Sequence, residues 1–222
     1  MGSGYIKIKL FPATLTSSIC FNSLLENQPS LPKSSLPPMV PNFVGREIEC
    51  DKIITSLTSE STRHVNIHGC AGFGKMSTAI SIGHHLQSKG QPVYFFTFRG
   101  INSKNEFISE LLSVFKRSVT PHLTPTNELC SFLQGISCRF CLDDILECST
   151  SDDNAATSVR DDVLKIIMKI LLYCQNACIL TTTRAKSCQS IDLKMEGNES
   201  IRIEPLDAKT SVTMVNDFLV LR

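Results

Sequence analysis

The sequence has no long apolar run and no excess of charge of either sign. A helix that crosses a bilayer needs roughly 20 mainly apolar residues, and no stretch reaches that length, so we expect no membrane partner. The 22 basic and 21 acidic residues leave a net charge of +1, so no polyanion-binding surface is predicted and we expect no nucleic-acid partner. The 222 residues, 42% of them hydrophobic, suffice for one domain with a substantial core.

The ten cysteines have no regular spacing of the kind found in secreted disulfide-rich domains. They are scattered through predicted helices and strands, which favours reduced thiols and a cytoplasmic location. One alternative is a zinc site made by Cys138-x-x-Cys141 with Cys174-x-x-x-Cys178. Because both pairs fall in or beside apolar segments of the predicted sheet, we favour buried free thiols, which pack as small hydrophobic groups.

The first 40 residues differ from the rest in composition. They contain five prolines and many serines but few charged residues, which predicts a poorly ordered tail or linker over residues 1–40. Residues 41–222 are predicted to form a single folded domain.

Within this domain, apolar runs that predict strands alternate with segments of helical periodicity. The predicted strands are 65–67, 93–98, 140–142, 177–180 and 200–203. The predicted helices are 48–57, a helix beginning near 75, 107–115, 127–133, 159–171 and 207–221. This alternation indicates an α/β fold with a parallel sheet of about five strands, joined by right-handed crossovers and covered by helices on both faces.

The stretch 64–80 reads H-V-N-I-H-G-C-A-G-F-G-K-M-S-T-A-I and has the layout of a phosphate-binding loop. Gly69, Gly74 and Lys75 fit the frame G-x-x-x-x-G-K. Gly69, Gly72 and Gly74 allow successive backbone N–H groups to face phosphate oxygens, and the following helix offers its positive end. The alternative, a glycine-rich turn without a ligand, is less favoured because strand, loop, lysine and helix come in the required order.

The residue after Lys75 is Met76, where the motif has a Ser or Thr whose hydroxyl binds magnesium. Ser77 follows one position later, about 100° further round a helix, and is not expected to replace that ligand. The sequence therefore predicts nucleotide binding with a weakened Mg²⁺ site and weak ATPase activity at most.

Charged residues directly follow two of the predicted strands. Asp143 and Asp144 come after the run 140–142 and suit a magnesium–water site beside the phosphates. Arg184 ends the strand that begins at Ala177, on the ligand side of an open α/β sheet, where it is able to sense a terminal phosphate. The alternatives are an acidic loop and a surface arginine that caps a strand.

Four motifs in this order resemble the NB-ARC family, the signal-transducing P-loop NTPases of plant resistance proteins and animal apoptosome-type adaptors. They are Phe-Val-Gly-Arg-Glu at 43–47, Gly-Cys-Ala-Gly-Phe-Gly-Lys at 69–75, Leu-Asp-Asp at 142–144 and Ile-Leu-Thr-Thr-Thr-Arg at 179–184. The resemblance covers about residues 40–220. It implies a P-loop NTPase fold and an ADP/ATP-dependent switch in innate-immunity or apoptosis signalling. It also implies protein partners or self-oligomerisation, with the family's later subdomains absent from 41–222.

The resemblance also implies roles for individual residues. In nucleotide binding, it places Phe43, Val44 and Arg46 near the adenine, Lys75 at the β and γ phosphates, and Ser77 near the α phosphate. In hydrolysis, it implies that Asp143 binds magnesium through water, that Asp144 is the base and that Arg184 senses the γ phosphate.

Three functions follow as alternatives. The favoured one is an ADP- or ATP-binding switch domain with little turnover. The second is an active magnesium-dependent ATPase, which the two aspartates and Arg184 favour and Met76 opposes. The third is a non-binding interaction fragment of a larger receptor.

Overall fold

The structure is a computed structural model that describes residues 34–98, 100–115, 125–134, 136–145, 153–184 and 197–220. Of the tail expected over residues 1–40, residues 1–33 lie outside these ranges and residues 34–40 lie within them. In chain order the elements are α2 (Glu47–Thr58), β1 (His64–Gly69), α3 (Lys75–Ser88), β2 (Val93–Thr97), α4 (Lys104–Ser113), α5 (Pro125–Leu133), β3 (Cys138–Asp143), α6 (Asp153–Tyr173), β4 (Ala177–Arg184), β5 (Asn198–Arg202) and α7 (Ala208–Val220). The predicted alternation of strands and helices is confirmed.

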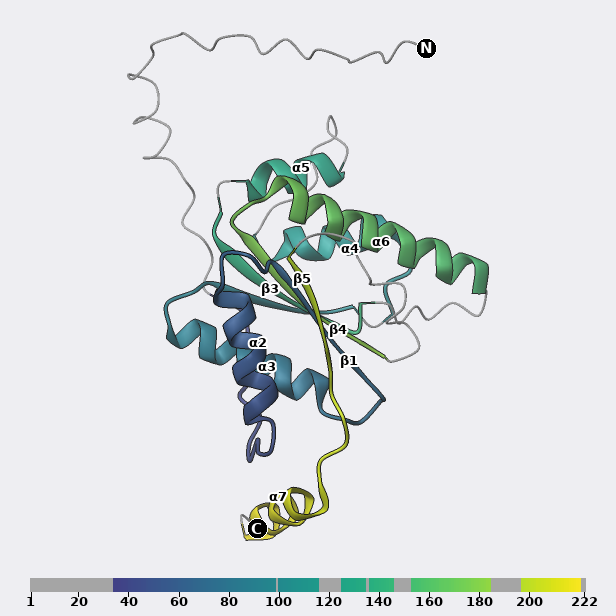
Figure 1. The fold of residues 1–222 in the computed structure, drawn as a ribbon. Helices are drawn as coiled ribbons and strands as arrows, with labels where there is room; N and C mark the ends of the chain where they lie inside the picture. The colour runs from purple at the N-terminus through teal and green to yellow at the C-terminus, as the bar shows by residue number, and fades with distance from the viewer. Residues whose placement is uncertain are drawn as a thin grey trace, which may run out of the picture. The chain divides into compact units, whose positions relative to one another are not determined.

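The described strands form one five-stranded sheet in the order β2-β3-β4-β1-β5, and every pairing is parallel. Helices cover both faces, with α2 and α3 on one and α4, α5 and α6 on the other (Figure 1). The predicted α/β fold is therefore confirmed. No helix in these ranges has the length and apolar character that a membrane crossing requires.

Strands β2, β3 and β4 contribute to two apolar cores because successive side chains point to opposite faces, whereas the apolar residues of β1 and β5 belong to one of them. On one face Val65 and Leu180 pack with Ile53 of α2 and Ile82 of α3. On the other face aromatic and aliphatic residues of β2, β3 and β4 pack against α4, α5 and α6. A sheet covered in this way has near-continuous apolar strands, as the sequence of β2 shows.

The backbone joins the sheet before residue 41, where we expected the folded domain to begin. The N–H of Ser35 donates to the Val93 carbonyl at 3.1 Å, and the Ser35 carbonyl accepts from the Phe95 N–H at 2.8 Å. Ser35 thus pairs in parallel orientation with β2, along the edge of this strand that faces away from β3.

A chain of buried polar side chains links β1 to β4. The hydroxyls of Thr181 and Thr183 donate to the Asn66 side-chain oxygen at 2.9 and 3.2 Å, and Nε2 of His64 lies 3.0 Å from the Thr181 hydroxyl oxygen. Because the Thr181 proton goes to Asn66, His64 must donate from Nε2. Burial lowers the pKa of His64 to about 4, so the imidazole is neutral at physiological pH.

We expect this histidine to make the fold acid-sensitive. Between about pH 6.5 and about pH 4 the unfolded chain binds a proton at His64 and the folded chain does not. The free energy of unfolding should therefore fall by about 3 kcal/mol as the pH drops through this window and be independent of His64 above it. Urea denaturation from about pH 7.5 to about pH 4 measures the slope.

The matched variants are His64→Gln, whose amide does not titrate but keeps a hydrogen-bond donor, and His85→Gln on the exposed end of α3. The first should flatten the pH dependence and the second should not. An equal slope in the parent chain and in His64→Gln would contradict the assignment.

Candidate functional site

The loop between β1 and α3 contains the predicted phosphate-binding motif. It runs from Gly69, the last residue of β1, to Gly74, which precedes the first helical residue Lys75. A Cβ atom at Gly69 would lie 2.5 Å from the Ile203 carbonyl oxygen, and Gly74 has a left-handed φ of 87°. Glycine is therefore required at the first position and favoured at the second. The loop leads into the N-terminus of α3, whose N–H groups and dipole favour an anion.

The side chain of Lys75 folds back against this loop, and the residue is only 7% exposed. Its Nζ donates to the carbonyl oxygens of Gly69 and Cys70, each at 2.9 Å. Burial lowers the pKa of Lys75, while the carboxylates of Asp144 and Asp143 oppose the shift and Arg184 adds to it. These three charged groups are thus close enough to act on the lysine.

A cavity of about 280 Å³ opens beside the loop. It is lined by predicted site residues from three segments and by two further residues of the loop and α3: Gly72, Gly74, Lys75, Ser77, Asp143, Asp144 and Arg184, with Ala71 and Met76. Strand pairing explains the convergence, because Gly69 ends β1 opposite Arg184 and β3 lies on the other side of β4. We call this space the phosphate cavity.

The hydroxyl of Thr182 bonds to both aspartates that line the phosphate cavity. It donates to Oδ1 of Asp143 at 2.6 Å and accepts the backbone N–H of Asp144 at 3.0 Å. Asp144 has a left-handed φ of 53°, a conformation that aspartate tolerates when its backbone is held by such a contact. Our reading of the sequence missed Thr182. The signal was its place in β4, next to the strand that ends in Asp143.

A second cavity of about 420 Å³ adjoins the first and is mostly apolar. It is lined by the predicted residues Phe43, Val44 and Arg46, by the shared residues Gly72, Gly74 and Ser77, and by Val40, Asn42, Phe73, Pro205, Leu206, Ser211 and Met214. We call it the apolar cavity. The sequence did not indicate its wall from residues 205–214, because nothing local marks a contact between segments so far apart in the chain.

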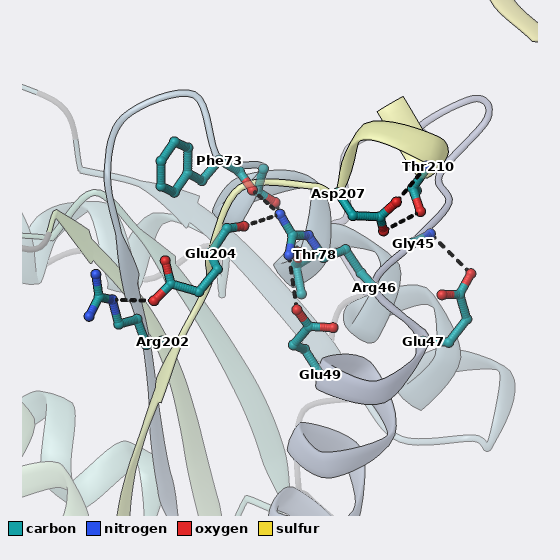
Figure 2. Close-up of polar contacts among 11 residues, drawn as sticks. Gly45, Arg46, Glu47, Glu49, Phe73, Thr78, Arg202, Glu204, Asp207 and Thr210 are labelled. Atoms are coloured by element: carbon teal, nitrogen blue, oxygen red, sulfur yellow. Dashed lines mark hydrogen bonds and ion pairs between the residues drawn. The ribbon is translucent and has the colours of Figure 1, made fainter. Parts of the chain in front are cut away.

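Arg46 lines the apolar cavity and is 5% exposed. Its Nη1 pairs with Oε1 of Glu49 at 2.9 Å, and its Nη2 donates to the carbonyl oxygens of Phe73 at 3.1 Å and Glu204 at 2.5 Å (Figure 2). The resemblance implied a role beside the adenine. Arg46 lines the apolar cavity, and its hydrogen bonds go to two backbone carbonyl groups and one carboxylate, so the role beside the adenine stays a prediction.

The four cysteines of the zinc alternative lie on opposite faces of the sheet. Cys138 and Cys174 belong to the core under α4, α5 and α6, whereas Cys141 and Cys178 belong to the core under α2 and α3. Burial raises the pKa of both Cys138 and Cys141 to about 12, which favours neutral thiols. Among the described residues no group of three or more His, Cys, Asp or Glu side chains is arranged to hold a metal ion.

No protein-family model matches the sequence, and no curated protein matches it either. Several solved structures are similar. Cdc6p from Pyrobaculum aerophilum has a TM-score of 0.59 at 14% identity, over 83% of this chain and 51% of that one. Drosophila ORC bound to DNA has a TM-score of 0.57 at 13% identity, over 82% and 48%. A DNA replication initiation factor has a TM-score of 0.52 at 18% identity, over 84% and 56%.

This chain therefore spans about half the length of these three chains. Identities this low show the fold and nothing finer. One similar structure is bound to DNA, so the comparisons do not support our expectation that nucleic acid is excluded as a partner. That expectation stays a prediction. The cytoplasmic location also stays a prediction. With its parallel sheet and its glycine-rich loop between β1 and α3, the chain has the α/β fold of a P-loop NTPase.

Proposed function

We propose that this domain binds ADP or ATP as a nucleotide-dependent switch and has weak ATPase activity at most. The observation that carries the proposal is the adjacency of the two cavities, which share Gly72, Gly74 and Ser77 as lining residues. A space lined by charged residues beside the phosphate loop thus lies next to a mostly apolar one. A nucleotide has the same division between charged phosphates and a flat, largely apolar base.

The phosphate cavity supports binding of the charged part. Lys75 and Arg184 line it, together with the N-terminus of α3. A helix N-terminus and backbone N–H groups bind phosphate without a metal ion. The apolar cavity supports binding of the base, because Phe43, Val44, Leu206 and Met214 are among its lining residues.

Magnesium binding is the weaker part of the site. Asp143 and Asp144 line the phosphate cavity, and they are the oxygen donors that Mg²⁺ prefers in proteins. Met76 lines it too, at the position where the loop motif has a metal-binding hydroxyl. A thioether is a soft ligand and does not replace that hydroxyl. We therefore propose that the metal is held through Asp143 and water, with reduced affinity.

The resemblance to NB-ARC proteins supports a more specific proposal. We propose that the domain is the switch part of a signalling protein of the innate-immunity or apoptosis type, which acts through protein partners or self-assembly. The support is the order of four motifs in the sequence, all of which contribute residues to the phosphate cavity or the apolar cavity. These residues are Phe43, Val44 and Arg46 from the first motif, 71–75 from the second, 143–144 from the third and Arg184 from the fourth.

An active ATPase is the second candidate, because Asp143, Asp144 and Arg184 line the same cavity as Lys75. Under this alternative Asp144 is the base that activates water and Arg184 contacts the γ phosphate. The two candidates differ in turnover and in dependence on magnesium.

We expect the parent chain to bind ADP in calorimetry with little dependence on Mg²⁺. Lys75→Met should weaken ADP binding at least about tenfold, because it removes charge-assisted contacts with the phosphates and keeps the length of the side chain. Lys89→Met, at the exposed C-terminal end of the same helix, is the matched control and should bind like the parent. Equal affinity of the Lys75 and Lys89 variants would contradict the assigned cavity. An ADP-independent melting temperature of the parent would favour the non-binding interaction fragment.

Position 76 decides between the switch and the ATPase. Met76→Thr supplies the missing hydroxyl at the first turn of α3, so it should raise Mg²⁺-dependent phosphate release from ATP by about tenfold or more. Met76→Leu keeps an apolar side chain and should behave like the parent. If the parent already releases phosphate as fast as Met76→Thr, the domain is an ATPase and the switch proposal is wrong.

The proposed metal position depends on Thr182. Thr182→Val removes the hydroxyl that bridges Asp143 and Asp144, so it should lower the free energy of unfolding by about 1–3 kcal/mol. Thr182→Ser keeps the hydroxyl and should lose less than half as much. Urea denaturation compares the two variants. A serine variant as unstable as the valine variant would show that packing of the methyl group, and not the bridge, is what matters.

A further inference from the structure

Arg46 joins three segments that are far apart in the sequence. It precedes α2, is 5% exposed, and contacts Glu49 in α2, Phe73 in the phosphate loop and Glu204 between β5 and α7. In Figure 2 the guanidinium lies between the strand-to-helix segment at Glu204 and the loop at Phe73. A buried guanidinium is stable only when its charge is balanced, and Glu49 supplies the balancing carboxylate.

The hydrogen bonds of Arg46 tie two carbonyl groups to one nitrogen. Nη2 carries two N–H donors, and they go to the Phe73 and Glu204 carbonyl oxygens. The guanidinium is planar and rigid, so a displacement of one carbonyl is passed to the other. A lysine, with a single point charge on a flexible stem, does not reproduce this geometry.

Phe73 lines the apolar cavity, and Glu204 is the chain neighbour of a lining residue, Pro205. Phe73 lies between Gly72 and Gly74, which line both cavities. Glu204 directly precedes Pro205 and Leu206, which line the apolar cavity together with Ser211 and Met214 of α7. The bond to Glu204 therefore fixes the wall of the apolar cavity relative to the phosphate loop.

Two further features define the start of α7: a local cap and a close approach to Gly45. Asp207 caps the helix, with Oδ1 accepting the Thr210 N–H at 2.9 Å and Oδ2 accepting the Thr210 hydroxyl at 2.6 Å. Gly45, the neighbour of Arg46, packs so closely that a Cβ atom there would be 2.2 Å from Cγ2 of Thr210. The start of α7 is thus packed directly against Gly45, the neighbour of Arg46 in the chain.

We propose that Arg46 is a positioning residue that couples the phosphate loop to α7, so that ADP in the loop rigidifies α7 through the Phe73–Arg46–Glu204 contacts. The inference rests on the proposed function, because it requires that ADP binds. It differs from a direct contact with the adenine, since Arg46 acts through the backbone of two other segments.

Hydrogen exchange of the 222-residue chain with and without saturating ADP tests the coupling. In the parent, ADP should slow exchange of α3 amides and slow exchange of α7 amides by about fivefold or more. In Arg46→Gln at saturating ADP, α3 should still be protected, and the slowing in α7 should be at least about twofold smaller than in the parent, because only the direct contact of the base with Ser211 and Met214 remains. Arg46→Lys keeps the charge and tests the paired geometry, and it should resemble Arg46→Gln.

The matched control is Arg202→Gln. Arg202 also contacts Glu204, through an exposed ion pair from Nε to Oε1 at 2.8 Å, but not through its backbone. This variant should keep the parent response in α7. The inference is wrong if α7 responds to ADP in Arg46→Gln as it does in the parent, or if ADP protects α3 but not α7 in the parent. If the parent shows no heat of binding and no change in α3, the proposed function has failed and the coupling fails with it.

Discussion

Parallel pairing of β1 with β4 is the interaction on which the whole site depends. Its register puts Gly69 opposite Arg184, so that the phosphate loop and the arginine meet at one edge of the sheet. The buried oxygen of Asn66 accepts from both Thr181 and Thr183, which specifies this register from inside the sheet. A shift of one residue would turn these side chains to the opposite face and leave buried polar groups without partners. The polar chain between the strands is thus a structural requirement of the site at their carboxyl ends.

The two cavities are built in different ways. The phosphate cavity is made by the carboxyl ends of neighbouring strands and by a loop whose shape glycines determine, so it follows from the sheet itself. The apolar cavity is assembled from residues 40–46 and 205–214, which are not paired in the sheet. Its shape depends on a few contacts, above all those of Arg46 with Phe73 and Glu204. Such a wall is easier to displace than a strand end, and a switch needs a part of this kind.

Sequence reasoning succeeded where the physical signal was local. The phosphate loop lies within a few residues, and strands covered on both faces have an apolar pattern that is easy to recognise, so the fold and the convergence of Lys75 with Arg184 were predictable. Thr182 was missed because its role needs the strand order, which places β4 beside β3. The contacts of Arg46 were missed because one partner lies 158 residues away. No periodicity reports a contact of this separation.

The charges that line the phosphate cavity explain why position 76 matters. Two formal positive charges, on Lys75 and Arg184, oppose two formal negative charges, on Asp143 and Asp144. The side chains therefore supply no net positive charge for a polyphosphate, and the α3 N-terminus with the loop N–H groups must supply the attraction. A metal ion would neutralise the carboxylates and raise that attraction. Under the proposed function, a thioether in the first helical turn in place of a hydroxyl reduces this contribution, and the backbone N–H groups have the larger part in binding. We therefore propose a preference for ADP, which has one phosphate fewer to neutralise than ATP.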